Sequence, residues 1–354
     1  MARKPVECET PALVIDEATA LKNIARFQAH CDRNGLKLRP HVKTHKSVLF
    51  AKAQVAAGAV GITCQKIAEA EVMAACGMDD ILITYNIVGE TKLTRLLALA
   101  DRVKSLSVTA DSTAVIKGLT AAFENAPRPV IVLVECDTGG RRCGVRTPEA
   151  AMELARTIAA CPGLTFGGLM TFPAIAGQRR VTDFMHDARA EIEALGIRCA
   201  EVSSGGSPDM WRAETGGVLT EYRAGTYIFN DRSLVSRGTC AWDDCAAHVV
   251  ATVVSVPTET RAIIDAGSKV LTSDLLGLEG FGHIIGRPGL RITGLSEEHG
   301  VIRYDPDDRL RVGNRVRIIP NHICVVTNML DFAWLRREGN ELAVLPIDAR
   351  GKVT

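Results

Sequence analysis

The chain has 354 residues, of which 47% are hydrophobic and 23% charged, and its formal net charge is +1. This composition predicts a folded protein with a sizeable core, and the length fits a barrel of about 250 residues followed by a smaller domain. The balanced charge, with basic pairs scattered and no aromatic residues between them, argues against nucleic acid as a partner.

The N-terminal nine residues are polar, and no run of 18 apolar residues occurs anywhere in the chain. We therefore expect neither a secretion signal nor a membrane partner. The 11 cysteines form no CxxC pair, which is typical of reduced thiols in a cytoplasmic protein.

A helix is predicted over residues 17–34, followed by eight strand-like segments with helical patterns between them. The segments are Leu36–Lys43, Ala59–Gln65, Asp80–Asn86, Leu106–Asp111, Pro129–Asp137, Thr165–Phe172, Cys199–Ser204 and Val218–Phe229. The intervening helices are expected at 46–57, 66–76, 89–101, 112–124, 147–160, 178–195 and near 208–214. Eight such units predict an α/β fold with a (β/α)8 barrel over residues 10–236; an open, doubly wound sheet is the alternative.

From residue 237 onward the pattern changes to short strands of period two, at His248–Val256, Arg261–Asp265, Gly300–Tyr304 and Arg315–Pro320. We expect a smaller β-rich domain over 237–354, which residues 1–9 join.

Lys43 follows Pro40, whose ring does not fit a helix interior, so we expect this lysine where the first strand ends. Active sites of barrels are built at that rim. A desolvated lysine there has a free amine that attacks carbonyl groups, although a random lysine is usually a solvated surface residue.

Other polar residues also stand at predicted strand ends, namely Gln65, Asn86 and Asp111. The fifth strand is followed by the Gly- and Arg-rich turn 136–145, the seventh by Ser203–Pro208, and the eighth segment contains Tyr222–Tyr227. In barrels the loops after strands seven and eight often bind phosphate, so these two are candidates for an anion site.

His322 and Cys324 are two residues apart, so on an extended strand both side chains would point the same way. Imidazole and thiolate together suit Zn²⁺, but two ligands two residues apart are a weak signal, and by this motif alone a pair that merely packs is the favoured interpretation. His41 and His45 have a spacing that would bind metal on a helix; Pro40 makes a helix doubtful, and we expect them to position whatever binds Lys43.

Several of these stretches together resemble the D-threonine aldolase/D-serine dehydratase group of fold-type III pyridoxal-phosphate enzymes. The stretches are Thr10–Asp16, Arg39–Lys46, Gln65–Glu71, Asp137–Gly144, Ser204–Pro208, Arg223–Tyr227 and Pro320–Cys324. The resemblance covers nearly the whole chain and implies an alanine-racemase-like barrel with a β domain, usually as a homodimer.

The resemblance also implies roles for individual residues. Lys43 would carry pyridoxal 5'-phosphate as a Schiff base, with Gln65 and Arg142 near its ring. His322 and Cys324 would bind a divalent metal beside the substrate, most simply zinc, with manganese or magnesium as alternatives. The cofactor phosphate would be held by the segments containing Ser204, Gly205, Gly206, Gly225, Thr226 and Tyr227.

The expected activity is retro-aldol cleavage of a D-β-hydroxy-amino acid, such as D-threonine, to glycine and an aldehyde. A dehydratase acting on D-serine or D-3-hydroxyaspartate is the first alternative, and an amino-acid racemase the second. A protein that only carries the cofactor, and a zinc hydrolase using His41 and His45, are the remaining ones. One departure concerns the substrate: Phe172 stands where relatives often have a tyrosine.

Overall fold

The protein was analysed as a computed structural model, which describes residues 8–213 and 217–354. The described chain divides into two compact units. The barrel unit comprises residues 26–43, 48–225 and 352–354, and the sheet unit comprises residues up to 25, 44–47 and 226–351. Helix α1 (Glu17–Arg33) begins in the sheet unit and ends in the barrel unit, close to its predicted bounds.

The barrel unit contains an eight-stranded parallel sheet in the order β2-β9-β8-β7-β6-β5-β4-β3. Its strands are β2 (Lys37–Leu38), β3 (Ile62–Cys64), β4 (Asp80–Asn86), β5 (Ser105–Ala110), β6 (Val130–Cys136), β7 (Leu164–Thr171), β8 (Glu201–Gly205) and β9 (Glu221–Arg223). A parallel bridge between His41 and Thr63 joins the two edges, and the Thr63 N–H donates to the Pro40 carbonyl at 2.8 Å. The (β/α)8 barrel and the following β-rich domain are therefore confirmed.

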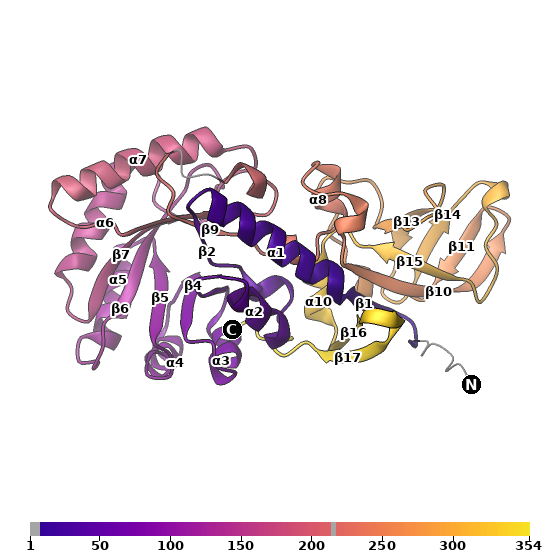
Figure 1. Cartoon of the computed structure of the whole chain (residues 1–354), viewed down its shortest axis with the longest axis horizontal. Helices are drawn as coiled ribbons and strands as arrows, with labels where there is room; N and C mark the ends of the chain where they lie inside the picture. The colour runs from indigo at the N-terminus through magenta and orange to yellow at the C-terminus, as the bar shows by residue number, and fades with distance from the viewer. Residues whose placement is uncertain (1–7, 214–216) are drawn as a thin grey trace. The chain divides into compact units, whose positions relative to one another are not determined.

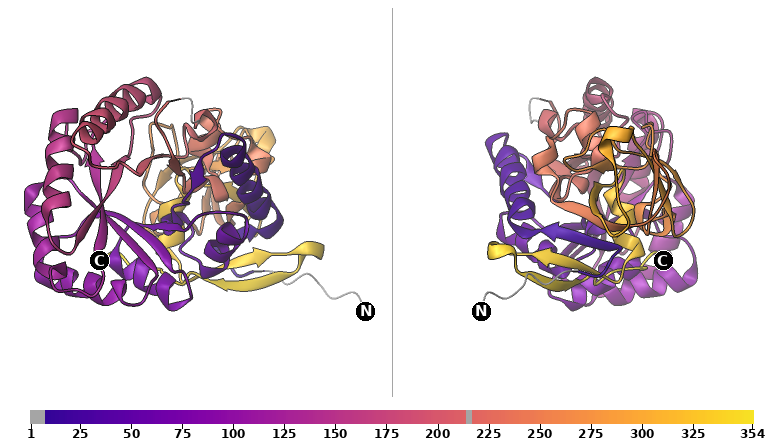
Figure 2. Two further views of the ribbon diagram at one scale, coloured as in Figure 1. Left: turned by 60° about the vertical axis from the view of Figure 1, so that its left-hand side comes forward. Right: turned by 90° about the vertical axis from the view of Figure 1, so that its right-hand side faces the viewer.

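Helices cover the outside of the barrel sheet (Figures 1 and 2). They are α2 (Val48–Ala56), α3 (Ile67–Ala75), α4 (Glu90–Ala100), α5 (Thr113–Phe123), α6 (Pro148–Ala160) and α7 (Gln178–Ala194). Each buries an apolar face, and α5 does so with Val115, Ile116, Leu119 and Phe123. A one-turn helix, η2 (Met210–Arg212), replaces the short helix predicted near 208–214, of which residue 214 lies outside the described part.

The first and eighth barrel strands are much shorter than predicted. β2 ends at Leu38, because Pro40 has no N–H to continue a ladder. The chain then forms a one-turn 3₁₀ helix, η1 (Val42–Thr44). The prediction that Lys43 ends a strand is thus wrong in detail: the lysine lies within η1, just beyond the closing bridge.

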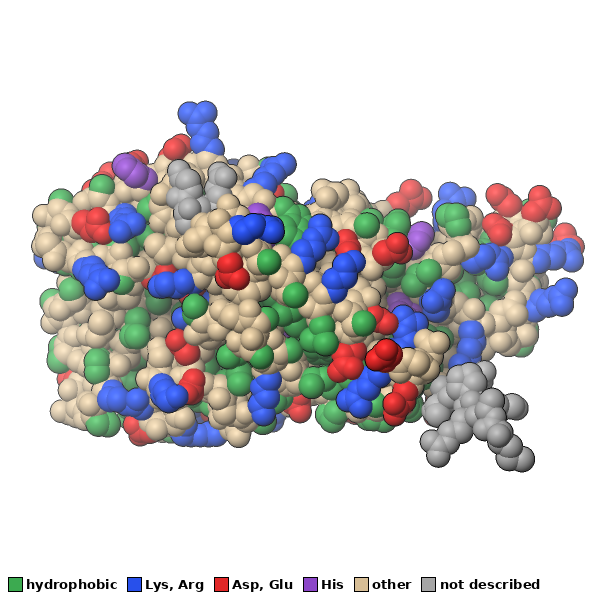
Figure 3. All heavy atoms as spheres, in the orientation of Figure 1, with side chains coloured by type: hydrophobic (Ala, Val, Ile, Leu, Met, Phe, Trp, Pro, Cys, Tyr) green, Lys and Arg blue, Asp and Glu red, His purple; other side chains and the backbone are tan. Residues whose placement is uncertain are grey.

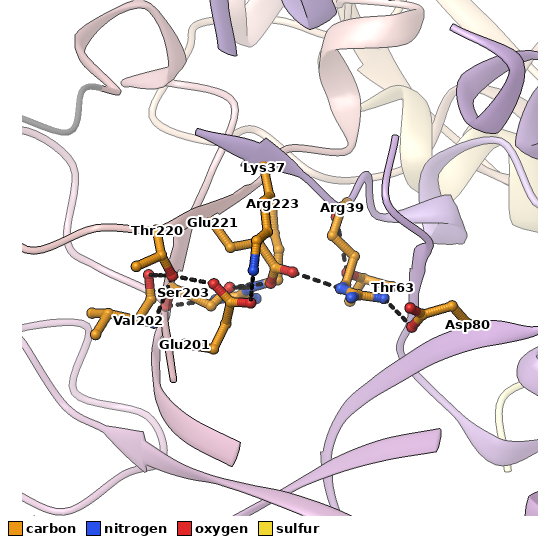
Figure 4. A network of polar contacts seen from close by, with 10 residues as sticks. All are labelled: Lys37, Arg39, Thr63, Asp80, Glu201, Val202, Ser203, Thr220, Glu221 and Arg223. Carbon is orange, nitrogen blue, oxygen red and sulfur yellow. Dashed lines mark hydrogen bonds and ion pairs between the residues drawn. The ribbon is translucent and has the colours of Figure 1, made fainter. Parts of the chain in front are cut away.

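Charged side chains form a network inside the barrel (Figure 4). Arg39 is its centre: Nε donates to Glu221 Oε2 at 2.7 Å and Nη1 to Asp80 Oδ1 at 2.6 Å. The Ser203 hydroxyl donates to the other oxygen of Glu221 at 2.6 Å and accepts from Arg223 Nε at 2.8 Å. The network therefore ties β8 and β9 to the start of the Lys43 loop.

The sheet unit contains the second sheet, in the order β13-β14-β11-β10-β1-β16-β17, with β15 paired to β10 and β12. Its strands are β1 (Ala12–Asp16), β10 (Ala247–Thr258), β11 (Arg261–Ile264), β12 (His283–Ile284), β13 (Arg291–Leu295), β14 (Gly300–Arg303), β15 (Arg315–Ile319), β16 (Phe332–Arg336) and β17 (Leu342–Pro346). Short helices α8 (Arg232–Ser236), α9 (Ser268–Leu271) and α10 (Ile323–Met329) lie between strands.

Strand β1 belongs to this second sheet, although the sequence placed residues from 10 onward in the barrel. It pairs with β10 in antiparallel and with β16 in parallel fashion, because its apolar face packs with Val250 and Cys8. The chain also enters the sheet unit at residue 226, eleven residues before the predicted start of the β-rich domain at 237. Of the N-terminal residues expected to join this domain, 1–7 lie outside the described part, while the Cys8 carbonyl accepts from Arg315 at 2.9 Å.

His248 on β10 makes the sheet unit sensitive to acid. Burial, with Arg336 and Arg317 nearby, lowers the pKa of His248 from 6.5 to about 4. Between these values the unfolded chain binds a proton that the folded protein does not, so the free energy of unfolding falls as pH falls through this window. Between pH 7 and pH 4, we expect the free energy of unfolding of His248→Gln, measured by urea titration, to fall by about 3 kcal/mol less than that of wild type. Equal losses would show that His248 does not titrate differently on unfolding.

The surface carries charges of both signs. On the face drawn in Figure 3, basic and acidic side chains are interspersed, which agrees with the net charge of +1. Among the described residues, no helix combines the length and the apolar character that crossing a membrane requires.

Candidate active site

Lys43 is half-buried, and its amine lies against the side chain of Gln65. Lys43 Nζ donates to Gln65 Oε1 at 3.2 Å, and the same oxygen lies 3.1 Å from His41 Nε2. Gln65 is itself held at both ends: its backbone N–H donates to Glu69 at 2.7 Å and its side-chain nitrogen to the Thr84 carbonyl at 2.9 Å. The amide oxygen is therefore aimed at the amine.

His41 supports this arrangement rather than a metal. Its Nε2 lies on the Gln65 oxygen, and its Nδ1 lies 3.5 Å from the Lys43 backbone nitrogen, a long contact. His45 is buried, and its Nδ1 accepts from the Ser47 N–H at 3.0 Å. Among the described residues no three His, Cys, Asp or Glu side chains are grouped to hold a metal.

Arg142 follows β6 in a turn that Asp137 organises. Asp137 Oδ1 accepts from the N–H groups of Gly139 and Arg141, both at 2.9 Å. The guanidinium of Arg142 stacks on the ring of Phe172, 4.7 Å from its centre. Phe172 lacks the hydroxyl of the tyrosine that relatives often have at this position, but its ring provides an aromatic face for Arg142. Stacking of this kind orients an arginine.

Glu135, near the end of β6, is a buried carboxyl that the sequence analysis missed. Burial raises its pKa, while the nearby guanidinium groups of Arg142 and Arg223 act in the opposite direction. Two further polar atoms at the ends of β4 and β5, Asn86 Oδ1 and Thr109 Oγ1, are buried without a hydrogen-bond partner in the protein. Buried polar atoms of this kind are usually satisfied by water or a ligand.

Part of the Gly/Ser loop after β8 packs against β9 and hydrogen-bonds to it within the barrel. A Cβ at Gly205 would lie 2.2 Å from the Arg223 carbonyl, so close pairing with β9 requires glycine there. The Gly206 N–H donates to the Arg223 carbonyl at 2.9 Å and is therefore used within the protein. Ser204 is buried beside it, and on the neighbouring strand the chain passes from Gly225 into the 3₁₀ turn η3 (Thr226–Ile228), which contains the buried Tyr227.

His322 and Cys324 do not lie on an extended strand, and that expectation is wrong. β15 ends at Ile319 before Pro320, and His322 is the residue that precedes helix α10, with Cys324 in its first turn. Asp231 Oδ2 accepts from the Ile323 N–H at 3.2 Å and so caps this helix start. The two side chains nevertheless interact, since each shifts the pKa of the other.

The electrostatics of the pair favour a thiolate on Cys324 beside a protonated imidazole on His322, whose proton a bound metal would displace. Burial alone would raise the pKa of the Cys324 thiol, but hydrogen bonds with His322, Thr44 and Thr226 outweigh it, and the pKa lies below its ordinary value. Burial opposes the charged form of His322, but Cys324 and Asp274 raise its pKa to about 9. Asp274 Oδ2 lies 2.7 Å from His322 Nδ1, which leaves Nε2 as the coordinating nitrogen.

Known proteins match this chain over nearly its full length. The N-terminal domain of alanine racemase matches residues 15–233, and a putative serine dehydratase domain matches residues 246–335. A D-threonine aldolase from an Arthrobacter species is 35% identical over 97% of this chain and 93% of its own length. The chain belongs to the D-threonine aldolase/D-serine dehydratase family. It is thus an enzyme of the pyridoxal-phosphate-dependent D-amino acid lyase family, and its fold is that of the fold-type III enzymes.

Relatives of both reaction types are present in this family. A D-threo-3-hydroxyaspartate dehydratase from a Delftia species is 34% identical over 89% of this chain and 91% of its own length. The crystal structure of a D-threonine aldolase from Filomicrobium marinum superposes with a TM-score of 0.89, at 31% identity, over 99% of this chain and 100% of that chain.

Two solved structures of D-threo-3-hydroxyaspartate dehydratase are variants at positions two residues apart. One replaces a histidine with alanine, and the other replaces a cysteine with alanine and is described as a metal-free form. They superpose on this chain with TM-scores of 0.89 and 0.88, at 31% identity, over 96% of it.

Proposed function

We propose that this enzyme cleaves D-β-hydroxy-amino acids of the D-threonine type to glycine and an aldehyde, with pyridoxal phosphate on Lys43 and a divalent metal on His322 and Cys324. The observation that carries the proposal is that Cys324 of the proposed metal pair contacts Thr44, the residue that follows the proposed cofactor lysine in the chain. Thr44, bonded directly to Lys43, has its hydroxyl 3.2 Å from Cys324 Sγ.

In the barrel unit, the side chains around Lys43 fit a bound cofactor. The Gln65 oxygen accepts from the lysine amine and keeps it in place for attack on the cofactor carbonyl. Arg142, held on Phe172, offers a fixed cation to the ring oxygen or to a substrate carboxylate. The orphaned atoms of Asn86 and Thr109 support a ligand at this end of the barrel. When bound, the cofactor supplies an electron sink for the pair left at Cα.

Ser204 and the stretch Gly225–Tyr227 remain the candidates for the phosphate. Ser204 carries a hydroxyl, and the turn η3 begins at Thr226, where the first backbone N–H groups of a helical turn have no partner within the turn. Gly205 serves this site by letting the backbones of β8 and β9 approach closely, whereas the Gly206 N–H is already used by the Arg223 carbonyl.

In the sheet unit, the His322–Cys324 pair fits a metal with open coordination positions. A thiolate and an imidazole suit zinc better than manganese or magnesium, which prefer oxygen. Asp274 orients His322, in the way that carboxylates commonly support metal-binding histidines. The dehydratase variants at a histidine and a cysteine with the same spacing support this assignment. The metal would supply Lewis acidity at the β-hydroxyl.

Dehydration is the second candidate, because a dehydratase relative has a histidine and a cysteine with the same spacing as His322 and Cys324. In that reaction a base must take the α-proton, and the amine of Lys43, once released, is the candidate. The near full-length match to the D-threonine aldolase favours cleavage. Racemisation has less support, since the C-terminal part matches a putative serine dehydratase domain.

D-Threonine separates these reactions in one assay. Cleavage gives glycine and acetaldehyde, whereas dehydration gives 2-oxobutanoate and ammonia, and racemisation at Cα gives L-allo-threonine. We expect glycine and acetaldehyde, a fall in activity of at least about tenfold after exhaustive chelation, and recovery with Zn²⁺. A keto acid from D-threonine or D-3-hydroxyaspartate would instead identify the dehydratase. L-allo-Threonine formed after chelation would overturn both lyase proposals.

A further inference from the structure

The sulfur of Cys324 lies against two threonine hydroxyls whose roles the proposed chemistry does not define. Thr44 Oγ1 is 3.2 Å from Cys324 Sγ, and Thr226 Oγ1 is 3.5 Å from it. Thr44 is fully buried. All three residues belong to the sheet unit, although they come from three distant parts of the chain.

The two threonines lie at the two points where the chain passes from the barrel unit into the sheet unit. The chain passes from the barrel unit to the sheet unit at the Lys43–Thr44 bond and again at the Gly225–Thr226 bond. Thr44 is therefore the residue directly after the cofactor lysine, and Thr226 the residue directly after a glycine of the candidate phosphate segment. At both crossings, the first side chain in the sheet unit touches the same sulfur.

The rest of the ligand pair is already anchored by other groups. Asp231 caps the start of α10 through the Ile323 N–H at 3.2 Å, and Asp274 holds the His322 ring at 2.7 Å. The Cys324 side chain rotates about one bond, and the two hydroxyls fix that rotation. Outer partners of this kind orient a metal ligand, and their loss typically weakens metal binding 10- to 100-fold.

We infer that Thr44 and Thr226 are positioning residues, which fix the metal-ligating sulfur of Cys324 and couple metal binding to cofactor binding through the Lys43–Thr44 and Gly225–Thr226 peptide bonds. This inference rests on the proposed function. Because such coupling is reciprocal, metal should tighten cofactor binding by the same factor by which cofactor tightens metal binding.

Zinc affinity of the holoenzyme, measured by competition with a chromogenic chelator, tests the positioning role. Valine matches threonine in shape but lacks the hydroxyl. We expect Thr44→Val and Thr226→Val each to weaken Zn²⁺ binding about tenfold, within the range for lost outer partners, and Thr44→Ser to retain wild-type affinity. Thr327→Val is the matched control: Thr327 is a buried threonine of the same helix, and its hydroxyl donates to the Ile323 carbonyl.

The affinity for pyridoxal phosphate, measured with and without Zn²⁺, tests the coupling. In wild type we expect Zn²⁺ to tighten cofactor binding, and in Thr44→Val/Thr226→Val we expect this tightening to disappear while the fold, followed by thermal melting, persists. Thr327→Val should keep it. A structural role alone would change the melting temperature without removing the coupling.

The outcomes separate this inference from the proposed function. If Cys324→Ala abolishes zinc binding while the double valine variant binds zinc and couples it as wild type does, the two threonines have no positioning role and the proposed metal pair stands. If Cys324→Ala binds zinc like wild type, the metal pair itself is wrong, and the inference fails with it.

Discussion

Replacing Lys43 with alanine is expected to lower kcat by at least about 10³-fold, the scale on which positioned proton-transfer and covalent groups contribute. The substitution removes the amine that is proposed both to hold the cofactor and to take the α-proton. The Gln65 oxygen would lose the donor 3.2 Å away, but its bonds to Thr84 and Glu69 remain, so the loop should stay folded. Turnover of the purified variant measures the effect.

Lys52 provides the control for this substitution. It lies on helix α2 only nine positions further along the chain, but it is exposed to solvent. Lys52→Ala should keep wild-type turnover and cofactor absorbance. Full turnover by Lys43→Ala would disprove the role of the lysine, whereas a loss shared by both variants would point to damage to the fold.

The second large effect is expected on stability. Glu221 is 1% exposed, and its carboxylate accepts from Arg39 at 2.7 Å and from the Ser203 hydroxyl at 2.6 Å. Glu221→Ala leaves Arg39 Nε and the Ser203 hydroxyl without their acceptor, and removing one partner of a buried ion pair costs about 3–5 kcal/mol. We expect a loss of this size in the free energy of unfolding, measured by urea denaturation.

The pair Lys37–Glu201 in the same network offers a matched comparison (Figure 4). Its atoms are 2.9 Å apart, but the Lys37 side chain is 52% exposed. Solvent screens such a pair, so Lys37→Ala should cost under about 1 kcal/mol. Equal losses for the two variants would mean that burial does not decide the strength of these ion pairs.

Sequence patterns predicted the barrel helices well, because each helix depends on residues that are close together in the sequence. The helices α2 to α7 lie within two residues of the predicted ranges, since each depends on an apolar stripe and nearby end signals. Residues 12–16, which form β1, were placed in the wrong domain for the opposite reason. The strand's partners are the distant residues 247–250 and 334–336, which no local pattern indicates.

The candidate site likewise contains residues that the sequence indicated and contacts that it did not. Lys43, Gln65 and Arg142 follow strands, and their type and position were visible in the sequence. The surroundings of Cys324 were not: its hydroxyl partners are 280 and 98 residues away along the chain. Pro320 could have indicated that the His322–Cys324 stretch leaves the strand, since proline has no N–H to donate to a β ladder.

The central claim is that Lys43 carries pyridoxal phosphate, and borohydride reduction of the purified holoenzyme followed by peptide mapping tests it most directly. The account predicts a visible absorption band that the reductant bleaches, with the reduced cofactor attached to Lys43. Attachment to any other lysine, or the absence of a band after pyridoxal phosphate is added, would contradict it.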